Sequence, residues 1–106
     1  MPKVLVPLAD GCEELEAVTI IDLLRRAGIE VTVAGLKPGI VKASRGVQLV
    51  PDTTLDAALQ DDYDMLALPG GMPGATRLKE DARIPDLIRR MAAAGKHTAA
   101  ICAAPT

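Results

Sequence analysis

Residues 3–35 read KVLVPLADGCEELEAVTIIDLLRRAGIEVTVAG, and this stretch decides the fold. Two runs of apolar and β-branched residues, 3–8 and 29–35, predict strands, and the segment between them, 13–27, has the length and the residues of a helix. Acidic residues open that segment, two arginines close it and Gly28 follows it, as the helix dipole and a C-terminal glycine cap favour. Neither strand alternates apolar with polar residues, so we expect both to be parallel and covered on both faces.

The rest of the chain continues this alternation. In order, we expect short strands at 40–43 and 47–50 around Ser44-Arg45-Gly46, one or two helical turns at 55–59, a buried strand at 65–68, a turn cluster at 69–74, a helix at 84–94 before Gly95, and a last strand at 97–101. This order indicates an α/β fold with a mostly parallel sheet. A helix then begins after Cys102 and nothing follows Thr106, so we expect residues 1–106 to be the N-terminal portion of a single domain. Its remainder would lie on a second polypeptide or be absent.

Composition narrows the classes of function. The 106 residues carry 12 Lys and Arg against 14 Asp and Glu, a formal charge of −2, which gives no electrostatic footprint for nucleic acid. No apolar run reaches the ~18 residues of a membrane helix, and no signal-peptide pattern opens the chain. Two cysteines without framework spacing favour a reducing compartment, so we expect a cytoplasmic protein. No set of residues has metal-ligand spacing, and we expect no metal or other cofactor.

The segment 13–27 carries more apolar residues than the single stripe of a surface helix needs. The surplus fits a subunit interface or a helix that is buried within its own chain, and the sequence favours neither.

Cys102 is the best candidate nucleophile. It stands where the last strand ends and a helix begins, with the small residues Ala100 and Ala104 two positions to either side, which is the pattern of a nucleophile elbow. A helix N-terminus also favours the thiolate. The alternative is a buried structural cysteine. Cys12 could act as a resolving thiol, but a small packed side chain is the better interpretation.

Glu16 is the second candidate, because it follows the first strand and the carboxyl ends of parallel strands meet at the edge where ligands bind. Close to a thiolate, its protonated form would be favoured, and it could then donate a hydrogen bond to the sulfur and shuttle protons. The other interpretation is an exposed acid in the first helical turn, which is the better one for Glu13 and Glu14.

Gly70 and Gly71 follow another strand at the same edge. Their N–H groups could hold an oxyanion, although an ordinary tight turn is the simpler explanation. His97 opens the last strand, about 16 Å from Cys102 at ~3.3 Å per residue, and so lies at the wrong end of the sheet to act as its base. A Cys–His pair would need a histidine from outside this chain.

The sequence resembles the ThiJ/PfpI superfamily, in the branch of the parkinsonism-associated protein and its bacterial YajL-like relatives. The stretches that carry the resemblance are Gly11 to Val18, Leu24 to Ala34, Ser44-Arg45-Gly46, Leu68-Pro69-Gly70-Gly71 and Ala99 to Thr106. The resemblance implies a flavodoxin-like three-layer α/β/α sandwich and a homodimer built partly on the first helix. It also implies a domain nearly twice as long as this chain, with the family's histidine beyond Thr106.

By motif position, Cys102 matches the family's reactive cysteine and Glu16 the acid that hydrogen-bonds it. Gly71, beside Gly70, and Ala103 match positions whose backbone N–H groups face the site. Arg26 and Arg45 match arginines near the site at the dimer interface.

The resemblance implies a cofactor-independent glyoxalase or deglycase that acts on methylglyoxal and glycated adducts. An oxidative-stress sensor or redox chaperone that uses oxidation of the same cysteine is the alternative, and an intracellular cysteine peptidase comes last.

Overall fold

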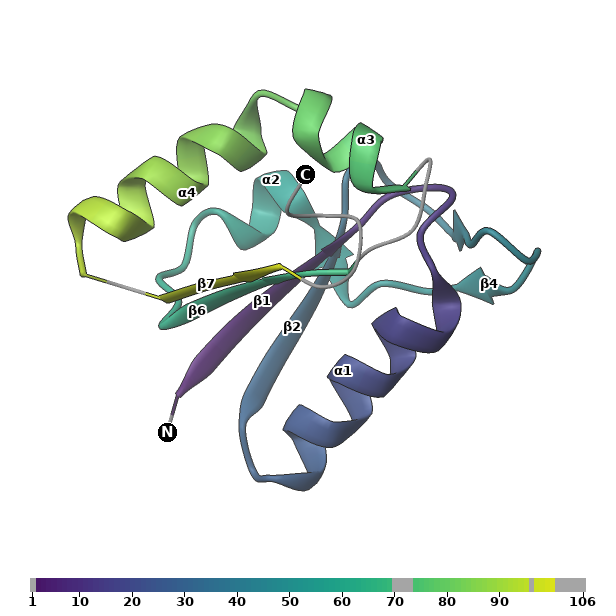
Figure 1. The fold of residues 1–106 in the computed structure, drawn as a ribbon, viewed down its shortest axis with the longest axis horizontal. Coiled ribbons are helices and arrows are strands. Elements are labelled where there is room, and N and C mark those ends of the chain that lie inside the picture. Colours follow the sequence, from purple (N-terminus) through teal and green to yellow (C-terminus); the bar gives the residue numbers. More distant parts are fainter. Residues whose placement is uncertain (1, 70–73, 96, 101–106) are drawn as a thin grey trace.

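The computed structural model describes residues 2–69, 74–95 and 97–100. Five parallel strands form one sheet in the order β5-β2-β1-β6-β7, and β3 and β4 form a separate antiparallel hairpin (Figure 1). The strands are β1 (Lys3–Leu8), β2 (Glu30–Gly35), β3 (Val41–Lys42), β4 (Gln48–Leu49), β5 (Thr53–Thr54), β6 (Met65–Leu68) and β7 (His97–Ala100). The helices are α1 (Glu14–Arg26), α2 (Leu55–Ala58), α3 (Gly74–Glu80) and α4 (Arg83–Ala93).

The β1–α1–β2 unit forms as its sequence predicts. The Glu13 side chain caps α1 by accepting a hydrogen bond from the N–H of Leu15 at 3.3 Å. At the other end Gly28 takes a φ of +80°, where a side chain would be strained, and lets the chain turn into β2. The two strands then pair along their whole length, from Lys3 opposite Glu30 onward.

Helices cover both faces of the sheet, with α1 on one face and α2, α3 and α4 on the other (Figure 1). Successive residues of β1 therefore enter different cores. Val4 and Val6 pack with Ala17 of α1, and Leu5 packs with Leu87 of α4. This two-sided burial is the reason that β1 shows no apolar–polar alternation, and the α/β fold with a parallel sheet is confirmed.

The strand order reverses at β1. The chain passes from β1 to β2 on one side and later returns to β6 and β7 on the other side, which is the order of a flavodoxin-like sheet. Two elements, α3 and β5, were not predicted from the sequence. The helix α3 has only seven residues and follows Pro73 directly, and β5 has two, so neither offers enough periodicity to detect.

The outer face of α1 remains open to solvent within this chain. Ala17 is its only fully buried residue, while Leu15 is 73% exposed and Leu23 59% exposed. The described residues thus leave this face of α1 uncovered. None of the helices in the described part of the chain is long and apolar enough to cross a bilayer.

Candidate active site at the carboxyl edge of the sheet

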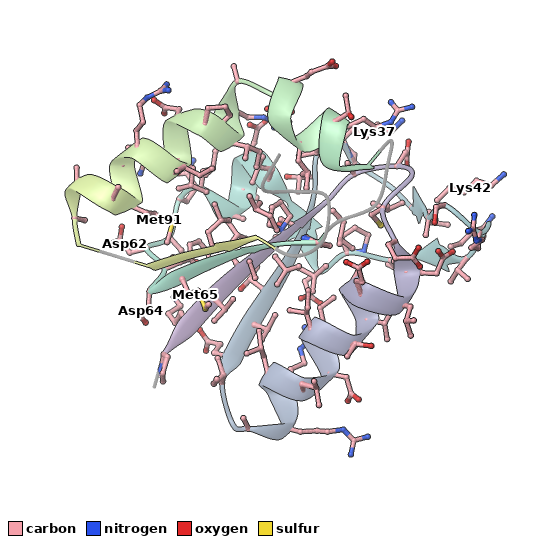
Figure 2. The ribbon with its side chains drawn as sticks, in the orientation of Figure 1. Lys37, Lys42, Asp62, Asp64, Met65 and Met91 are labelled. Atoms are coloured by element: carbon pink, nitrogen blue, oxygen red, sulfur yellow. The ribbon has the colours of Figure 1, made fainter. Side chains whose placement is uncertain are left out.

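Glu16 lies at the end of the sheet where open α/β folds bind ligands, beside the reversal of strand order. The carboxyl ends of β1 and β6 meet there. In Figure 2, Lys37 and Lys42 mark this end of the sheet, and Asp62, Asp64 and Met65 mark the opposite end. The position predicted for Glu16 in the first turn after β1 is confirmed.

The Glu16 carboxyl group carries a polar atom without a partner. Its Oε1 atom is buried and accepts or donates no hydrogen bond within the described residues. A buried polar oxygen costs about 1–3 kcal/mol unless it is hydrogen-bonded. The position therefore calls for a hydrogen-bonding group near the end of the sheet.

Four of the predicted site residues, Gly70, Gly71, Cys102 and Ala103, lie outside the described residues. The strand ends that precede them are described. Leu68 at the end of β6 pairs with Ala100 at the end of β7, so both predicted segments follow from neighbouring strand ends.

His97 lies at the amino end of the sheet, as expected from its spacing. It pairs with Met65, the first residue of β6, and thus opens β7 at the end opposite to Glu16.

Glu14 contributes more to this edge than the sequence analysis foresaw. Its Oε1 accepts a hydrogen bond from the Ser44 hydroxyl at 2.9 Å, and its Oε2 accepts from the N–H groups of Arg45 at 2.9 Å and Val47 at 3.4 Å. Desolvation opposes ionisation of Glu14, but these bonds and one from its own N–H outweigh it and lower the pKa of the carboxyl. Glu14 is thus an acid of the first helical turn, as predicted, but it is half-exposed and its carboxylate is hydrogen-bonded to the hairpin.

The β3–β4 hairpin docks on the loop between β1 and α1 through the backbone as well. The N–H of Gly11 donates to the Lys42 carbonyl, and the N–H of Ser44 donates to the Cys12 carbonyl, both at 2.8 Å. Asp10 accepts from the N–H of Lys42 at 3.0 Å. The hairpin that carries Arg45 is thus held against the loop that leads to Glu16.

Cys12 is fully buried and free, which confirms its interpretation as a small packed side chain. Burial, followed by the charge of Glu14, raises the pKa of its thiol to about 11. Cys12 therefore stays a neutral thiol at physiological pH and is a poor nucleophile.

The two predicted arginines lie in different places. Arg45 lies in the turn of the hairpin, beside Glu14. Arg26 lies in the last turn of α1, about 15 Å along the helix from Glu16 at ~1.5 Å per residue, where it pairs with Asp22 at 2.9 Å. A single chain does not bring Arg26 and Glu16 together.

A cavity of about 380 Å³ opens at the same end of the sheet, on the side of α3. Its walls include Leu8, the Asp10–Lys37 ion pair of 3.0 Å and Arg77. Glu16 is not among the described residues that line it, so the cavity is separate from the Glu16 carboxyl. Within the described ranges, no group of three or more His, Cys, Asp and Glu side chains could hold a metal ion.

The sequence profile of the DJ-1/PfpI family matches residues 2–106. The protein dj-1beta of Drosophila melanogaster is 50% identical over 103 residues, which are 96% of this chain and 55% of that protein. The glutathione-independent glyoxalase DJR-1.2 of Caenorhabditis elegans is 36% identical over 103 residues, which are 97% of this chain and 54% of that protein.

A solved structure of oxidized DJ-1 from Toxoplasma gondii superposes with a TM-score of 0.95 at 49% identity, over 99% of this chain and 58% of that one. The chain thus spans little more than half the length of these relatives. The comparisons confirm the resemblance to the ThiJ/PfpI superfamily and its DJ-1 branch. By profile, sequence and fold together, the chain belongs to the DJ-1/PfpI family.

Proposed function

We propose that the protein is a cofactor-independent glyoxalase or deglycase that acts on methylglyoxal and related dicarbonyl adducts through Cys102. The observation that carries the proposal is the buried Oε1 of Glu16, which has no hydrogen-bond partner within the described residues. The Cys102 sulfur would supply that partner, because it follows β7 at the same end of the sheet. The relative from Caenorhabditis elegans that is named a glutathione-independent glyoxalase supports this class of reaction.

The reaction would begin when the Cys102 thiolate adds to the aldehyde carbon of methylglyoxal. A C–S bond forms, and the carbonyl electron pair becomes an alkoxide, to which the N–H groups of Gly71 and Ala103 donate. Glu16 and a histidine from the part of the protein beyond this chain then move the proton from that carbon to its neighbour. This transfer yields a lactate thioester, and water cleaves the C–S bond to release lactate and restore the thiol.

The proposal includes a homodimer, with this chain as the N-terminal portion of a single domain in the cytoplasm. A second copy would cover the exposed apolar residues of α1. It would also explain Arg26, which is too far from Glu16 along its own helix to share a site with it. Arg26 would reach the site of the other protomer, whereas Arg45 would serve its own.

The proposal is tested by lactate formation from methylglyoxal in the whole protein that carries this chain. Cys102→Ser should lower turnover by at least about 10³-fold, because an alcohol at neutral pH is a far weaker nucleophile than a thiolate. Cys12→Ala is the matched control and should retain turnover, since Cys12 is a buried neutral thiol. Lactate formation that survives Cys102→Ser would exclude this mechanism.

A second candidate function is oxidative sensing through the same cysteine. The similar protein from Toxoplasma gondii was solved in an oxidized form, which favours it. A protonated Glu16 could donate a hydrogen bond to an oxygen of a Cys102 sulfinate. After mild peroxide, mass spectrometry should find two added oxygens on Cys102, and their appearance in a protein without dicarbonyl turnover would favour the sensor.

A further inference from the structure

The Glu14 carboxylate joins two elements that are far apart in the sequence. It belongs to the first turn of α1, and all three of its partners outside that helix, Ser44, Arg45 and Val47, belong to the turn between β3 and β4. Among the described residues, the side chain of neighbouring Glu13 accepts a bond only from Leu15 on its own helix, so it makes no such connection. Glu14 is therefore a bridge between the helix of Glu16 and the hairpin of Arg45.

The turn also has hydrogen bonds of its own that do not involve Glu14. The N–H of Ala43 donates to the Val47 carbonyl at 2.8 Å, and the N–H of Gly46 donates to the Ala43 carbonyl at 3.0 Å. Gly46 has a φ of +89°, which suits glycine and needs no external support. Loss of the Glu14 carboxylate would therefore leave a hairpin that is formed but less firmly placed against α1.

Arg45 is the one charged residue among the three that this bridge holds. Its N–H is held at 2.9 Å, while its side chain is exposed and takes part in none of the ion pairs between described residues. A flexible cationic side chain binds an anion well only if its backbone is already fixed. If the side chain and the backbone both had to be ordered on binding, the loss of conformational entropy would weaken each contact.

We infer that Glu14 is a positioning residue, which fixes the backbone of Arg45 so that the guanidinium serves the anionic groups formed at Cys102, the alkoxide and the product carboxylate. This inference rests on the proposed function for the place of Arg45 beside Cys102. In this role Glu14 acts through the hairpin and not on a reacting atom. Its removal should therefore have the same effect as the loss of Arg45.

The test compares alkylation of Cys102 by iodoacetate, which is anionic, with alkylation by iodoacetamide, which is neutral and of similar size. The ratio of the two rates reports the positive potential at the sulfur and requires no glyoxalase activity. Arg45→Ala should lower the ratio roughly three- to tenfold, as expected for the loss of one nearby charge. Glu14→Ala should lower it to a similar extent, and the double variant should lower it no further.

The sign of the effect separates positioning from charge. Removal of a carboxylate makes its surroundings more positive, so a simple charge effect of Glu14→Ala would raise the ratio. Glu13→Ala removes the same charge one residue away and should leave the ratio unchanged or slightly raised. Ser44→Ala, which deletes one bond to Glu14 without any change of charge, should lower the ratio by a smaller factor and serves if Glu14→Ala folds poorly.

A ratio that rises in Glu14→Ala as in Glu13→Ala would overturn the inference, as would effects of Glu14→Ala and Arg45→Ala that multiply in the double variant. A wild-type protein without lactate formation would instead refute the proposed function, and the alkylation ratio would still decide the role of Glu14. Steady-state kinetics give a second readout in a protein with turnover. If Arg45 binds the ground state and the transition state equally, Glu14→Ala should raise KM more than it lowers kcat.

Discussion

Cys12 shows how its place in the fold suppresses the reactivity of a thiol, the opposite of what we propose for Cys102. Cys12 lies in the loop after β1, fully buried beside the carboxylate of Glu14, and both burial and that charge disfavour its thiolate. Cys102 follows a strand end at which the sequence predicts a helix, and the dipoles of such a helix would favour a thiolate. Reactivity should therefore be confined to Cys102.

The pH dependence of stability tests the description of Cys12. Its pKa in the folded protein is about 11, above the value of 9.0 for an unperturbed thiol, so the native state holds the proton more tightly than the unfolded state. Its contribution is complete below about pH 9 and is lost as the pH rises through about 11. Urea titrations should show that wild type loses about 2–3 kcal/mol more than Cys12→Ala over this range. Parallel losses in both proteins would contradict the burial of this thiol.

Glu14 and Glu16 mark the limit of sequence analysis for single residues. Glu16 could be predicted because its place follows from one strand and one helix that are adjacent in the sequence. The partners of Glu14 lie about 30 residues away, as the separation from Ser44 shows, and no local pattern announces them. The signal that could have identified Glu14 is the group of three acids at positions 13, 14 and 16, of which only Glu13 caps the helix.

The exposed apolar face of α1 leads to a prediction about dimer formation. Leu23→Glu places a charge on a side chain that is 59% exposed in the single chain, so it should change the stability of a protomer little. In a homodimer that covers this face, the same change should raise the dissociation constant at least about tenfold, because the charge would be desolvated without a partner. Light scattering coupled to gel filtration measures the mass directly.

The control for Leu23→Glu is Ala92→Glu, which adds the same charge to the exposed side of α4 on the other layer. Its mass should equal that of wild type. A dimer that persists in Leu23→Glu at micromolar concentration would show that another surface holds the copies together.

Helices and strands could be predicted where the segment is long and where recognisable residues mark its two ends. The helix α1 begins and ends within one residue of the predicted 13–27, because an acidic start and Gly28 frame thirteen helical residues. The helix α3 lacks such a frame. Of its described side chains, Leu78 alone is buried in the core, and one buried position defines no period.

At the scale of the whole molecule, the candidate site is assembled from connections that the sheet brings together and not from one motif. In the proposed site, the first turn of α1 would supply Glu16, the hairpin would supply Arg45, and the segments after β6 and β7 would supply Gly71 and Cys102. Parallel topology explains why these places could be predicted from strand order alone. The docking of the β3–β4 hairpin could not be predicted, because it depends on hydrogen bonds between segments that are far apart in the sequence and share no pattern.

Arg83 joins several elements on the α4 face, so its loss should lower the stability of the fold. Its guanidinium donates to Asp81, to Asp56 at 2.8 Å and to the Leu36 carbonyl at 2.7 Å, so it connects α4, α2 and the end of β2. Arg83→Ala should lower the free energy of unfolding in urea by about 1–3 kcal/mol, because charged donors are lost from a side chain that is only 29% exposed. Arg89→Ala removes an exposed ion pair at 3.8 Å and should change the free energy of unfolding by less than about 0.5 kcal/mol.

The hydrogen bonds from Arg83 lower the pKa of Asp81, so this stabilisation is present at neutral pH and is lost as the pH falls through the lowered value. The difference in the free energy of unfolding between wild type and Arg83→Ala should therefore become smaller in acid. If Arg83→Ala lowers this free energy no more than Arg89→Ala does at neutral pH, Arg83 does not connect these elements as described.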